Sequence, residues 1–510
     1  MTYDAPTTMM PRETILAVYE QGADAVVELV ERLFAQLADQ QEQLRSQQEM
    51  IVSLTARVKE LEDRLAKNSR NSSKPPSGDP TKPKPKSLRQ RSGKKRKAGG
   101  QKGHPGRTLS LAENPDRVVV HGLREQEECG GCGRSLAEEA IAASCERRQV
   151  VDVPPLALEV TEHLAQRKRC PGCGRITTAP FPEEASARGV SYGPRIEALS
   201  VYLMGYQLLP YERASELLGD LFGEPAPGVG TLHSALRRSF EELERTEEEI
   251  EERLRQARVG HFDETGLRVG GKGMWAQAKP ASTAKLTHYA VHEKRGSEAT
   301  EEIGILPSFR GVAVHDGWSA YQQYEQCAHA LCNAHHLREL TFVEEEHKQE
   351  WAGRMKALLS EIEEAVRKEA ACGQTHLAPE KIGDFEGRYQ RLLEAGLEAN
   401  PPPERTGKRG RPKQTKGKNL LDRLDKHREA VLRFMRDFGV PFDNNQAERD
   451  LRMVKVRQKI SGCFRTKEGA AAFCRIRGYI STVKKQGENV LLALEGVFRG
   501  NPFVLTLQAE

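Results

Sequence analysis

The sequence predicts a multidomain protein with an N-terminal coiled coil, a small cysteine-rich module, an α/β core that carries a largely helical insertion, and a helical C-terminus. Three observations predict this fold class. Apolar residues follow a heptad between residues 30 and 65, two Cys-x-x-Cys pairs follow at 129–132 and 170–173, and three strand-like segments begin near residue 259. The 510 residues are enough for several domains with a sizeable core.

The composition indicates which kinds of protein the chain can be. Only 37% of the residues are hydrophobic and 30% are charged, which indicates long surface helices or polar linkers. No run of eighteen apolar residues occurs, so we expect no membrane span. The first residues, MTYDAPTTMMPRET, lack the basic and apolar regions of a secretory signal. We therefore expect the ten cysteines in a reducing cytoplasm, where paired cysteines more often bind metal than form disulfides.

Residues from about 25 to 66 follow a heptad that predicts a coiled coil. Aliphatic residues occupy six successive a positions: Val30, Leu37, Leu44, Ile51, Val58 and Leu65. The d positions are Leu33, Gln40, Gln47, Leu54 and Leu61. Glutamine at d lowers stability but can fix the register and the number of partners. The length of the segment and its lack of Gly and Pro favour a coiled coil over the alternative, one amphipathic helix packed on its own domain.

The positive charge of the chain is concentrated in one stretch. From Lys67 to Arg107 there are fourteen Lys and Arg residues and one acid, Asp79, whereas the rest of the chain holds 64 basic and 72 acidic residues. The densest part consists of Lys94, Lys95, Arg96 and Lys97. Such a block indicates a polyanionic partner, above all nucleic acid, with a merely solvated linker as the alternative. The surrounding Asn, Ser, Pro and Gly residues cannot form a core.

Two cysteine pairs predict a zinc site. Cys129-x-x-Cys132 and Cys170-x-x-Cys173 each continue with glycine, as tight thiolate turns often do. Four thiolates in two such turns suit one tetrahedral Zn²⁺, and the strand-like segments VVDVPP and LEVTEHLAQR lie between them. Buried free thiols are the alternative. The unpaired cysteines are expected to be merely buried; they are Cys145, Cys327, Cys372, Cys463 and Cys474.

The remaining chain alternates between helical and strand-like segments. Helices are expected from about Gly193 to Glu251, where a small bundle could bind DNA. Three strands follow, in VGHFDETGLRV, MWAQAK and LTHYAVHE. Then come a helix near 298–303, a strand GVAVHD, a helix GWSAYQQY, a strand AHALC and one long helical region from Ala334 to about Ala371. Helices resume near Asn444 and continue to about Arg499, so we predict a mixed sheet with helices on its faces.

Two aspartates stand where sites collect in such folds. Asp263 and Asp316 each follow hydrophobic residues at the end of a predicted strand, so both side chains should emerge at one edge of the sheet. Taken singly, such residues are more often caps or turn residues. Glu264 is a competing candidate, which we place second because neighbouring side chains in a strand point to opposite faces.

A third carboxylate, Glu448, lies on the first turn of the helix that begins NNQAERDLRMVKVRQK. Arg452, Lys455 and Lys459 extend along the same helix, and this cationic stripe would suit a phosphate backbone, although a solvated face is the bland alternative. Mg²⁺ prefers hard oxygen ligands, and two such ions can activate the attacking oxygen and stabilise the leaving oxygen of a phosphodiester. Three carboxylates could hold both ions, with the first aspartate bridging them.

Two further motifs have open interpretations. CNAHHLREL places Cys332, His335 and His336 at a metal-like spacing, but no second pair lies nearby, so a structural role or a DNA contact is favoured over zinc. Arg409 and Arg411 flank a glycine in KRGRPKQ. An extended Arg-Gly-Arg segment can lie in a narrow A·T minor groove, whose negative potential attracts guanidinium groups. A solvated basic loop is an equal alternative.

The sequence resembles the insertion sequence 66 family of transposases along nearly its whole length. The segments that carry the resemblance, in the family's order, are KNSRNSSKPPSGD, GGQKGHPGRTL, HFDETG, DGWSAY, CNAHHLREL, NNQAERDLRMVKVRQKISG and GNPF. The resemblance implies a ribonuclease-H-like core with a DDE triad, whose roles fall on Asp263, Asp316 and Glu448. It also implies a zinc-binding domain at the cysteine pairs. The 132 positions from Asp316 to Glu448 imply an insertion in the core.

The resemblance implies an activity and partners as well. Such a protein would bind the terminal inverted repeats of its element and target DNA, and it would cut and join strands with two Mg²⁺ per site, for which Mn²⁺ can substitute. The coiled coil would form a homo-oligomer, and small accessory proteins of the same element are plausible partners. We expect a cytoplasmic, nucleoid-associated protein. A catalytically inactive, transposase-derived regulator, a metal-dependent DNA nuclease and a structural nucleoid protein are the alternative functions.

These expectations divide the chain into six regions. The predicted regions are an N-terminal helical oligomerisation region (1–67), a basic Pro/Gly-rich linker (68–115), a zinc-binding module (116–185), a helical DNA-binding subdomain (186–252), a catalytic core (253–465) with an insertion at about 340–440, and a helical C-terminal region (466–510).

Overall fold

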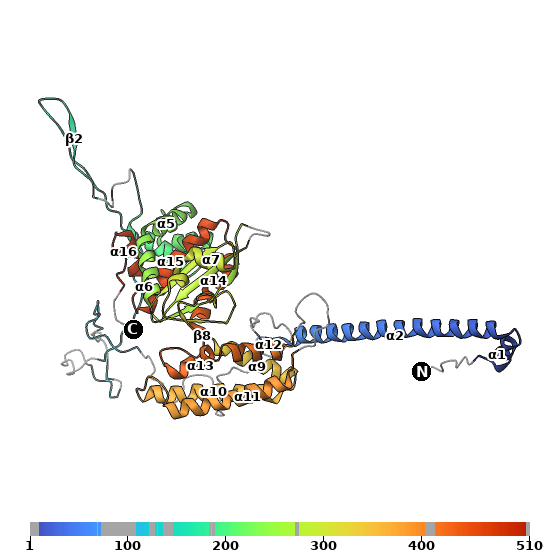
Figure 1. Ribbon diagram of the computed structural model, residues 1–510. Coiled ribbons are helices and arrows are strands. Elements are labelled where there is room, and N and C mark those ends of the chain that lie inside the picture. Colours follow the sequence, from blue (N-terminus) through green and yellow to red (C-terminus); the bar gives the residue numbers. More distant parts are fainter. Residues whose placement is uncertain are drawn as a thin grey trace. The chain divides into compact units, whose positions relative to one another are not determined.

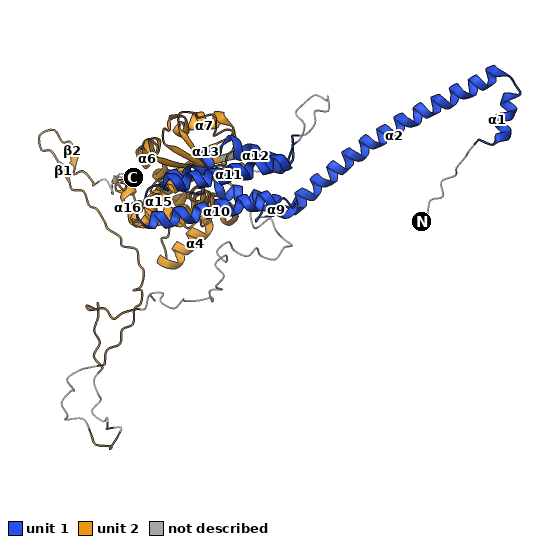
Figure 2. Cartoon of the chain, turned by 60° about the horizontal axis from the view of Figure 1, so that its bottom comes forward, with its two compact units in different colours: residues 1–85, 330–443 blue, residues 86–329, 444–510 orange. Residues whose placement is uncertain are grey.

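The structure is a computed structural model of the 510-residue chain. It describes residues 10–68, 70–72, 109–121, 128–129, 131–135, 146–182, 185, 189–270, 275–402 and 414–505. The chain forms two compact units, and each unit is assembled from two separate stretches (Figure 2). Residues 1–85 and 330–443 make the first, which we call the helical unit, and residues 86–329 and 444–510 make the second, the sheet unit.

The helical unit begins with a short helix, α1 (Arg12–Tyr19), and a long one, α2 (Ala23–Ala66) (Figure 1). The 44 residues of α2 include no Gly or Pro, so nothing in its sequence interrupts the backbone hydrogen bonds. Leu29 is the one residue of α2 that is buried. The helix of the predicted coiled coil is therefore present, and its pairing stays a prediction.

Five helices from the second stretch complete the helical unit. They are α9 (Asn333–Glu346), α10 (Glu350–Ala371), α11 (Pro379–Ala399), α12 (Lys416–Lys426) and α13 (Arg428–Arg436). Trp351, Met355 and Tyr389 lie in their common apolar core, and Ala66 at the end of α2 packs against it. The long helical region predicted from Ala334 to about Ala371 is helical, but it consists of two helices, α9 and α10. The chain breaks between α9 and α10, where Lys348 has a φ of +55°, which a right-handed helix cannot accommodate.

The sheet unit is built around a six-stranded sheet (Figure 1). Its strands are β3 (Val259–Phe262), β4 (Thr265–Arg268), β5 (Trp275–Ser282), β6 (Thr287–His292), β7 (Val312–His315) and β8 (Ala328–Leu331). The order is β4-β5-β3-β7-β8, and β6 also pairs with β5. β5 is antiparallel to β3, β4 and β6, whereas β3 and β7 are parallel. The predicted combination of a mixed sheet and helices is confirmed.

The helices of the sheet unit come from both stretches. They are α3 (Pro194–Val201), the π-helix η4 (Tyr202–Tyr206), α4 (Tyr211–Phe222), α5 (Val229–Glu242), α6 (Glu244–Gln256), α7 (Ser297–Ile303), α8 (Ile305–Ser308), α14 (Asn445–Ser461), α15 (Lys467–Lys485) and α16 (Val490–Phe498). α15 lies against β6, and α14 contacts β3, β4 and β5. A side chain at Gly478 of α15 would meet the carbonyl oxygen of Thr287 at 3.1 Å, so glycine allows this close approach.

The first strand of the predicted core is shorter than expected. The segment VGHFDETGLRV, predicted as one strand, forms both β3 and β4, with a break at Asp263 and Glu264. The Asp263 carboxylate accepts the backbone N–H of Glu264 at 2.8 Å, a local bond that competes with the ladder of the sheet. The break therefore falls at a candidate catalytic residue.

The helix predicted in GWSAYQQY is also wrong, because residues 319–323 form turns and the rest of the segment is irregular. Gly317 has a φ of +90°, outside the helical region. Its N–H donates to the side chain of His315 at 3.1 Å, and the N–H of Trp318 donates to the Asp316 carboxylate at 2.9 Å. These side chains satisfy the backbone in a turn and orient the loop that follows β7.

The cysteine-rich region contains less regular structure than the sequence suggested. β1 (Arg167–Arg169) and β2 (Ile176–Thr178) pair antiparallel, and the described parts of VVDVPP and LEVTEHLAQR are otherwise irregular. Among the unpaired cysteines, Cys327 and Cys474 are buried as expected, but Cys372 and Cys463 are exposed, so burial was a wrong prediction for those two. Cys145 lies outside the described residues. In the part of the chain that is described, no helix is long and apolar enough to cross a membrane.

Candidate active site

The sheet brings Asp263 and Asp316 to the ends of two neighbouring parallel strands. β3 and β7 pair with His261 opposite Val314. When this register is continued by two residues, Asp263 comes opposite Asp316. Each aspartate is the first residue after its strand, so both carboxylates leave the sheet at the same edge.

Glu448 reaches the sheet unit from a distant part of the sequence, on the first turn of α14. Asn444, immediately before this helix, is buried. Its Oδ1 lies 2.8 Å from Nδ1 of His261, and its Nδ2 donates to the carbonyl oxygen of Phe262 at 2.9 Å. Both partners belong to β3, so the side chain of Asn444 holds the beginning of α14 at the strand that leads into Asp263.

The three predicted carboxylates act on one another electrostatically. Burial and the negative charges of Asp316, Glu264 and Glu448 together raise the pKa of Asp263 from 3.8 to about 7, against the opposing effect of the hydrogen bond from the Glu264 N–H. The shift shows that Asp316 and Glu448 both lie within electrostatic reach of Asp263. In the sheet unit the fold thus brings together three residues that are separated by up to 185 positions in the sequence.

Glu264 belongs to a separate network. Its side chain is only 4% exposed and accepts hydrogen bonds from Tyr321 and from Arg295, whose Nη2 lies at 2.8 Å. The guanidinium group of Arg295 also lies over the ring of Trp318, 4.8 Å from its centroid. Burial and the charge of Glu264 raise the pKa of Tyr321 well above its usual value, which keeps the hydroxyl protonated as a donor. Glu264 therefore already has two donors, unlike a carboxylate reserved for a metal.

The carboxylate set fits hard divalent cations. Burial is the largest reason that the pKa of Asp263 is raised, and repulsion by the neighbouring acids adds to it. A bound cation would offset the negative charges, and Mg²⁺ is satisfied by few protein ligands because it keeps several of its waters. Within the described residues, the oxygens of Asp263, Asp316 and Glu448 do not all come within 4.8 Å of one another. The support for a cation here is therefore the raised pKa of Asp263, not close contact among the three carboxylates.

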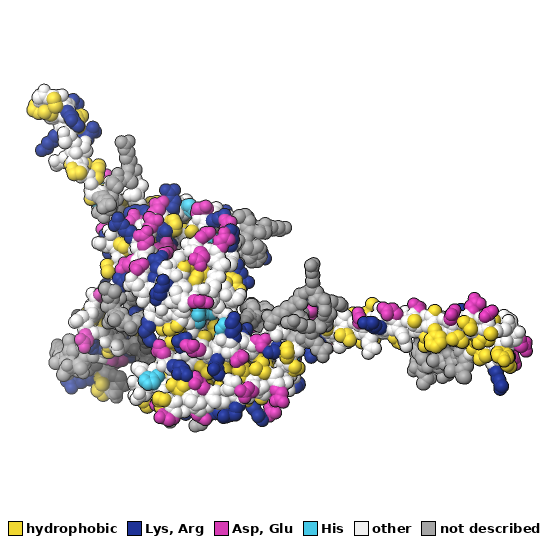
Figure 3. Space-filling view, viewed as in Figure 1, with side chains coloured by type: hydrophobic (Ala, Val, Ile, Leu, Met, Phe, Trp, Pro, Cys, Tyr) yellow, Lys and Arg dark blue, Asp and Glu magenta, His cyan; other side chains and the backbone are white. Residues whose placement is uncertain are grey.

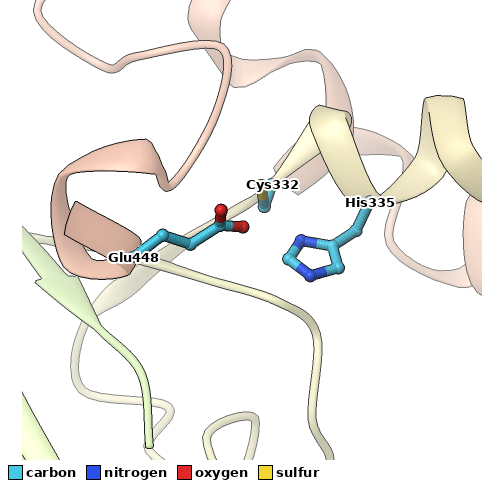
Figure 4. Close-up of side chains that lie close together, drawn as sticks. All are labelled: Cys332, His335 and Glu448. Carbon is cyan, nitrogen blue, oxygen red and sulfur yellow. The ribbon is translucent and has the colours of Figure 1, made fainter. Parts of the chain in front are cut away.

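The motif CNAHHLREL lies at the start of α9 in the helical unit. Cys332 precedes the helix and His335 is on its first turn, and their ligand atoms lie within 4.8 Å of each other. Figure 4 shows both side chains, and it shows Glu448 leaving the first turn of α14. His336 is buried with its Nδ1 at 3.1 Å from Oδ1 of Asn333. Burial and the nearby Arg423 lower the pKa of His336 well below its usual value, which indicates a neutral core histidine.

The two cysteine pairs adopt the same backbone geometry. The N–H of Gly133 donates to the carbonyl of Cys129, and that of Gly174 donates to Cys170. Both glycines have a φ of +70°, a conformation that other residues rarely adopt. Backbone N–H groups lower the pKa of the Cys129 thiol and likewise that of the Cys170 thiol. Such turns are preorganised for thiolates, although the described structure does not bring the four sulfurs together within 4.8 Å.

The predicted DNA-binding residues are only partly visible. Arg452 and Lys459 are exposed on α14, and Lys455 donates to the carbonyl oxygen of Gly266. Burial lowers the pKa of Lys455. Lys455 is thus tied to β4, although it is exposed like the other two cations. The other predicted cations lie outside the described residues; they are Lys94, Lys95, Arg96, Lys97, Arg409 and Arg411.

Sequence reasoning missed several residues that build the site. Asn444 and His261 fix α14 on β3, while Tyr321 and Arg295 engage Glu264. The sequence held one usable signal, the asparagine at the beginning of a helix, which normally suggests a helix cap. In the structure the Asn444 side chain caps nothing in α14 and instead bonds to β3. Tyr321 and Arg295 had no local signal, because both contacts cross many residues.

Comparisons with known proteins agree with this picture. The family model described as Transposase IS66 family matches residues 189–472, which is more than half of the chain. A family of unknown function (DUF6444) matches residues 21–110, which include all of α2 and the basic stretch. No curated protein matches the sequence. The first match spans both aspartates, Glu448 and the strands and helices that position them. The chain therefore belongs to the IS66 family of transposases.

Proposed function

We propose that this transposase binds the ends of its element and catalyses Mg²⁺-dependent strand cleavage and strand transfer into target DNA, with Asp263, Asp316 and Glu448 as its DDE triad. The observation that carries the proposal is the electrostatic coupling of the three carboxylates at the ends of β3 and β7 and on α14. The strand order also favours it: antiparallel strands come first and β7 then pairs parallel to β3, as expected for a ribonuclease-H-like core.

In the proposed reaction the three carboxylates hold two divalent ions. The ions, when bound, activate the attacking hydroxyl or water and stabilise the charge on the leaving oxygen. The chain's own task is to position the ligands. The β3–β7 pair fixes the two aspartates, and Asn444 fixes the helix that carries Glu448. Glu264 and Trp318 hold the exposed guanidinium of Arg295 beside this site, where it can contact a phosphate.

DNA would be held mainly by lysine and arginine side chains away from the carboxylates. The exposed Arg452 and Lys459 extend a cationic face along α14, and the basic stretch from Lys67 to Arg107 would contribute most of the electrostatic affinity. We propose that the protein acts on the chromosome in the cytoplasm, as a homo-oligomer that pairs two element ends through α2. Small accessory proteins of the element would be further partners.

The decisive experiment uses the full-length protein, labelled linear DNA that carries the ends of its element, unlabelled target DNA and Mg²⁺. We expect nicks at the element ends and products in which those ends are joined to target DNA. Nicks without joined products would make the protein a nuclease, and DNA binding without any cleavage would make it a regulator. Either result would overturn the proposed transposition.

We also propose that Cys129, Cys132, Cys170 and Cys173 hold one structural Zn²⁺. The matching backbone turns and the lowered thiol pKa values support this, because thiolates are the form that binds the metal. Purified protein should contain about one zinc per chain by elemental analysis. The double substitution of Cys129 and Cys170 by serine should remove it, whereas serine at the exposed Cys372 should not. Freshly prepared, reduced protein without zinc would contradict the assignment.

The basic stretch gives a second quantitative expectation. Deleting residues 82–102 removes ten Lys and Arg residues. Each phosphate contact that is lost should flatten the slope of log affinity against log salt by about 0.9, so DNA binding should weaken most at low salt. Fluorescence anisotropy titrations between low and high salt measure this slope. An unchanged slope would mean that the stretch is only a linker.

A further inference from the structure

The helix α2 carries an apolar stripe, interrupted by Gln40 and Gln47, that the described part of its own chain leaves exposed. Every aliphatic a and d residue from Val30 to Leu65 is at least 40% exposed, and Leu65 is 81% exposed. Figure 3 shows hydrophobic side chains gathered along this helix. A stripe of this length on a 44-residue helix is costly to leave in water and indicates an interaction surface.

The helix does dock on its own chain, but with the opposite face. Asp63 pairs with His347 (3.2 Å) and Lys416 (2.8 Å), and Ala66 packs on the core of the helical unit. Although burial opposes it, the hydrogen bonds from Lys416 and His347 lower the pKa of Asp63. In the heptad Asp63 is an f residue and Ala66 is a b residue, both away from the a/d stripe. The own-chain contact thus fixes the end of α2 while its stripe stays open toward a partner.

We infer that the stripe pairs with α2 of a second copy as a parallel, in-register two-stranded coiled coil. This inference rests on the homo-oligomer proposed above and specifies its geometry. The apolar d residues are all leucine, and three of the six a residues are the β-branched Val30, Ile51 and Val58. That combination favours two strands.

The flanking positions are self-complementary in this register. In a parallel pair each g residue faces the e residue five positions later in the partner helix. Arg57 then faces Glu62 of the second copy. Two levels pair glutamine with glutamine, Gln36 with Gln41 and Gln43 with Gln48, and one level pairs Met50 with Thr55. The charged level and the two amide levels are thus complementary in this register.

The core layers lead to the same orientation. In the parallel register Gln40 meets Gln40 and Gln47 meets Gln47 of the second copy, so the amides can bond to each other. An antiparallel pair that buries the same layers would place Gln40 against Ile51 and Gln47 against Leu44. Each buried amide would then face an aliphatic side chain, which leaves its polar groups without a hydrogen-bond partner and disfavours this orientation.

Parallel pairing has a consequence for assembly. The C-terminal end of α2 is the end that is fixed to the helical unit through Asp63 and Ala66. Two copies in register would therefore bring their helical units to the same end of the coil. The basic stretches, which begin at the same end, would start side by side and could receive two DNA ends together.

Disulfide trapping in the full-length, zinc-loaded protein tests the orientation. Val30→Cys and Leu61→Cys are made separately, with Ala56→Cys on the exposed f face as the matched control. Under oxidised glutathione we expect covalent dimers linked at position 30 or at position 61, at least about tenfold above the control, because a disulfide needs its Cβ atoms about 4 Å apart. Peptide mass spectrometry separates these links from those of the native cysteines.

The same variants define the opposing results. Links that form only when Val30→Cys and Leu61→Cys proteins are mixed would show antiparallel pairing and overturn the inference. A monomer in sedimentation at high concentration, without links, would overturn both this inference and the proposed homo-oligomer. Neither result depends on cleavage of DNA, so loss of the proposed activity and loss of the coiled coil remain distinguishable.

The pair of Arg57 and Glu62 offers an independent readout. Arg57 bonds to Glu60 of its own helix at 3.0 Å, so single substitutions alone are ambiguous. Arg57→Glu or Glu62→Arg should each weaken dimerisation roughly tenfold, since two symmetric sites then carry like charges. A mixture of the two variants should form heterodimers of nearly wild-type affinity. Mixing without this recovery would contradict the parallel register.

Discussion

We expect Asp263→Asn, Asp316→Asn and Glu448→Gln each to reduce DNA cleavage and joining by at least about a thousandfold, while DNA affinity stays nearly unchanged. Each substitution keeps the shape of the side chain and removes one negative charge. The divalent ions then lose part of their charge compensation, and the transition state loses electrostatic support. DNA affinity should persist because it rests on lysines and arginines elsewhere. Rates with labelled element ends and anisotropy titrations measure the two quantities separately.

Glu264→Gln is the matched control for the triad. It lies beside Asp263, but its carboxylate already accepts hydrogen bonds from Arg295 and Tyr321. Glutamine keeps one acceptor and the side-chain volume, so we expect activity within about tenfold of the wild type. Mn²⁺ should partly restore the triad variants, because Mg²⁺ demands nearly ideal octahedral coordination. Robust joining by Glu448→Gln in Mg²⁺ would refute the triad. If Glu264→Gln were the only one of these variants to lose activity, Glu264 rather than Asp263 would be the first carboxylate of the triad.

The positions of the two aspartates could be predicted from local sequence patterns. Each follows a short apolar segment, and such segments form strands whose ends carry sites. The pairing of β3 with β7 could not be predicted locally, since it joins residues that lie 53 positions apart. The same holds for Glu448, which reaches the site through the contact of Asn444 with β3. The β3–β7 pairing and the role of Glu448 were expected from the family resemblance, not from local sequence patterns.

The two elements that differ from the prediction share one feature, a residue with a positive φ. The segment GWSAYQQY has acceptable helix propensity, but Gly317 adopts a positive φ and side chains of β7 and the loop capture its first N–H groups. The long helical region expected after Ala334 is divided into α9 and α10, and Lys348 between them has a left-handed φ of +55°. Propensity is a weak prior that such contacts override.

The apolar heptad shows the opposite case. The heptad repeat extends over enough residues to predict a helix, and α2 spans Ala23–Ala66 without interruption. The sequence could not show which face the chain itself would use. The structure assigns that contact to Asp63 and Ala66, at f and b positions, and the a/d stripe is exposed in the part of the chain that is described.

The carboxylate cluster should also destabilise the protein when no metal is bound. Asp263 has a folded pKa of about 7, whereas its value in the unfolded chain is near 3.8. Below pH 4 the group is protonated in both states and does not affect the free energy of unfolding. Between pH 4 and 7 it ionises only in the unfolded chain, so stability falls as the pH rises, and above pH 7 the penalty is constant. A shift of this size corresponds to a penalty on the order of 2–4 kcal/mol.

We therefore expect Asp263→Asn to raise the stability of the metal-free protein at pH 8 by a few kcal/mol and to leave it unchanged at pH 4. Asparagine can still accept the N–H of Glu264, so the local turn is kept while the buried charge is removed. Mg²⁺ should stabilise the wild type at pH 8 and have little effect on the variant, because the cation offsets the same repulsion. Asp220→Asn, at an exposed position of α4, is the control and should change neither quantity. Thermal and denaturant unfolding of the sheet unit, followed in EDTA and in Mg²⁺, measure both effects. If Asp263→Asn lowers the stability at pH 8 in EDTA, Asp263 does not carry the buried charge. If Mg²⁺ stabilises both proteins equally, Asp263 does not bind the metal.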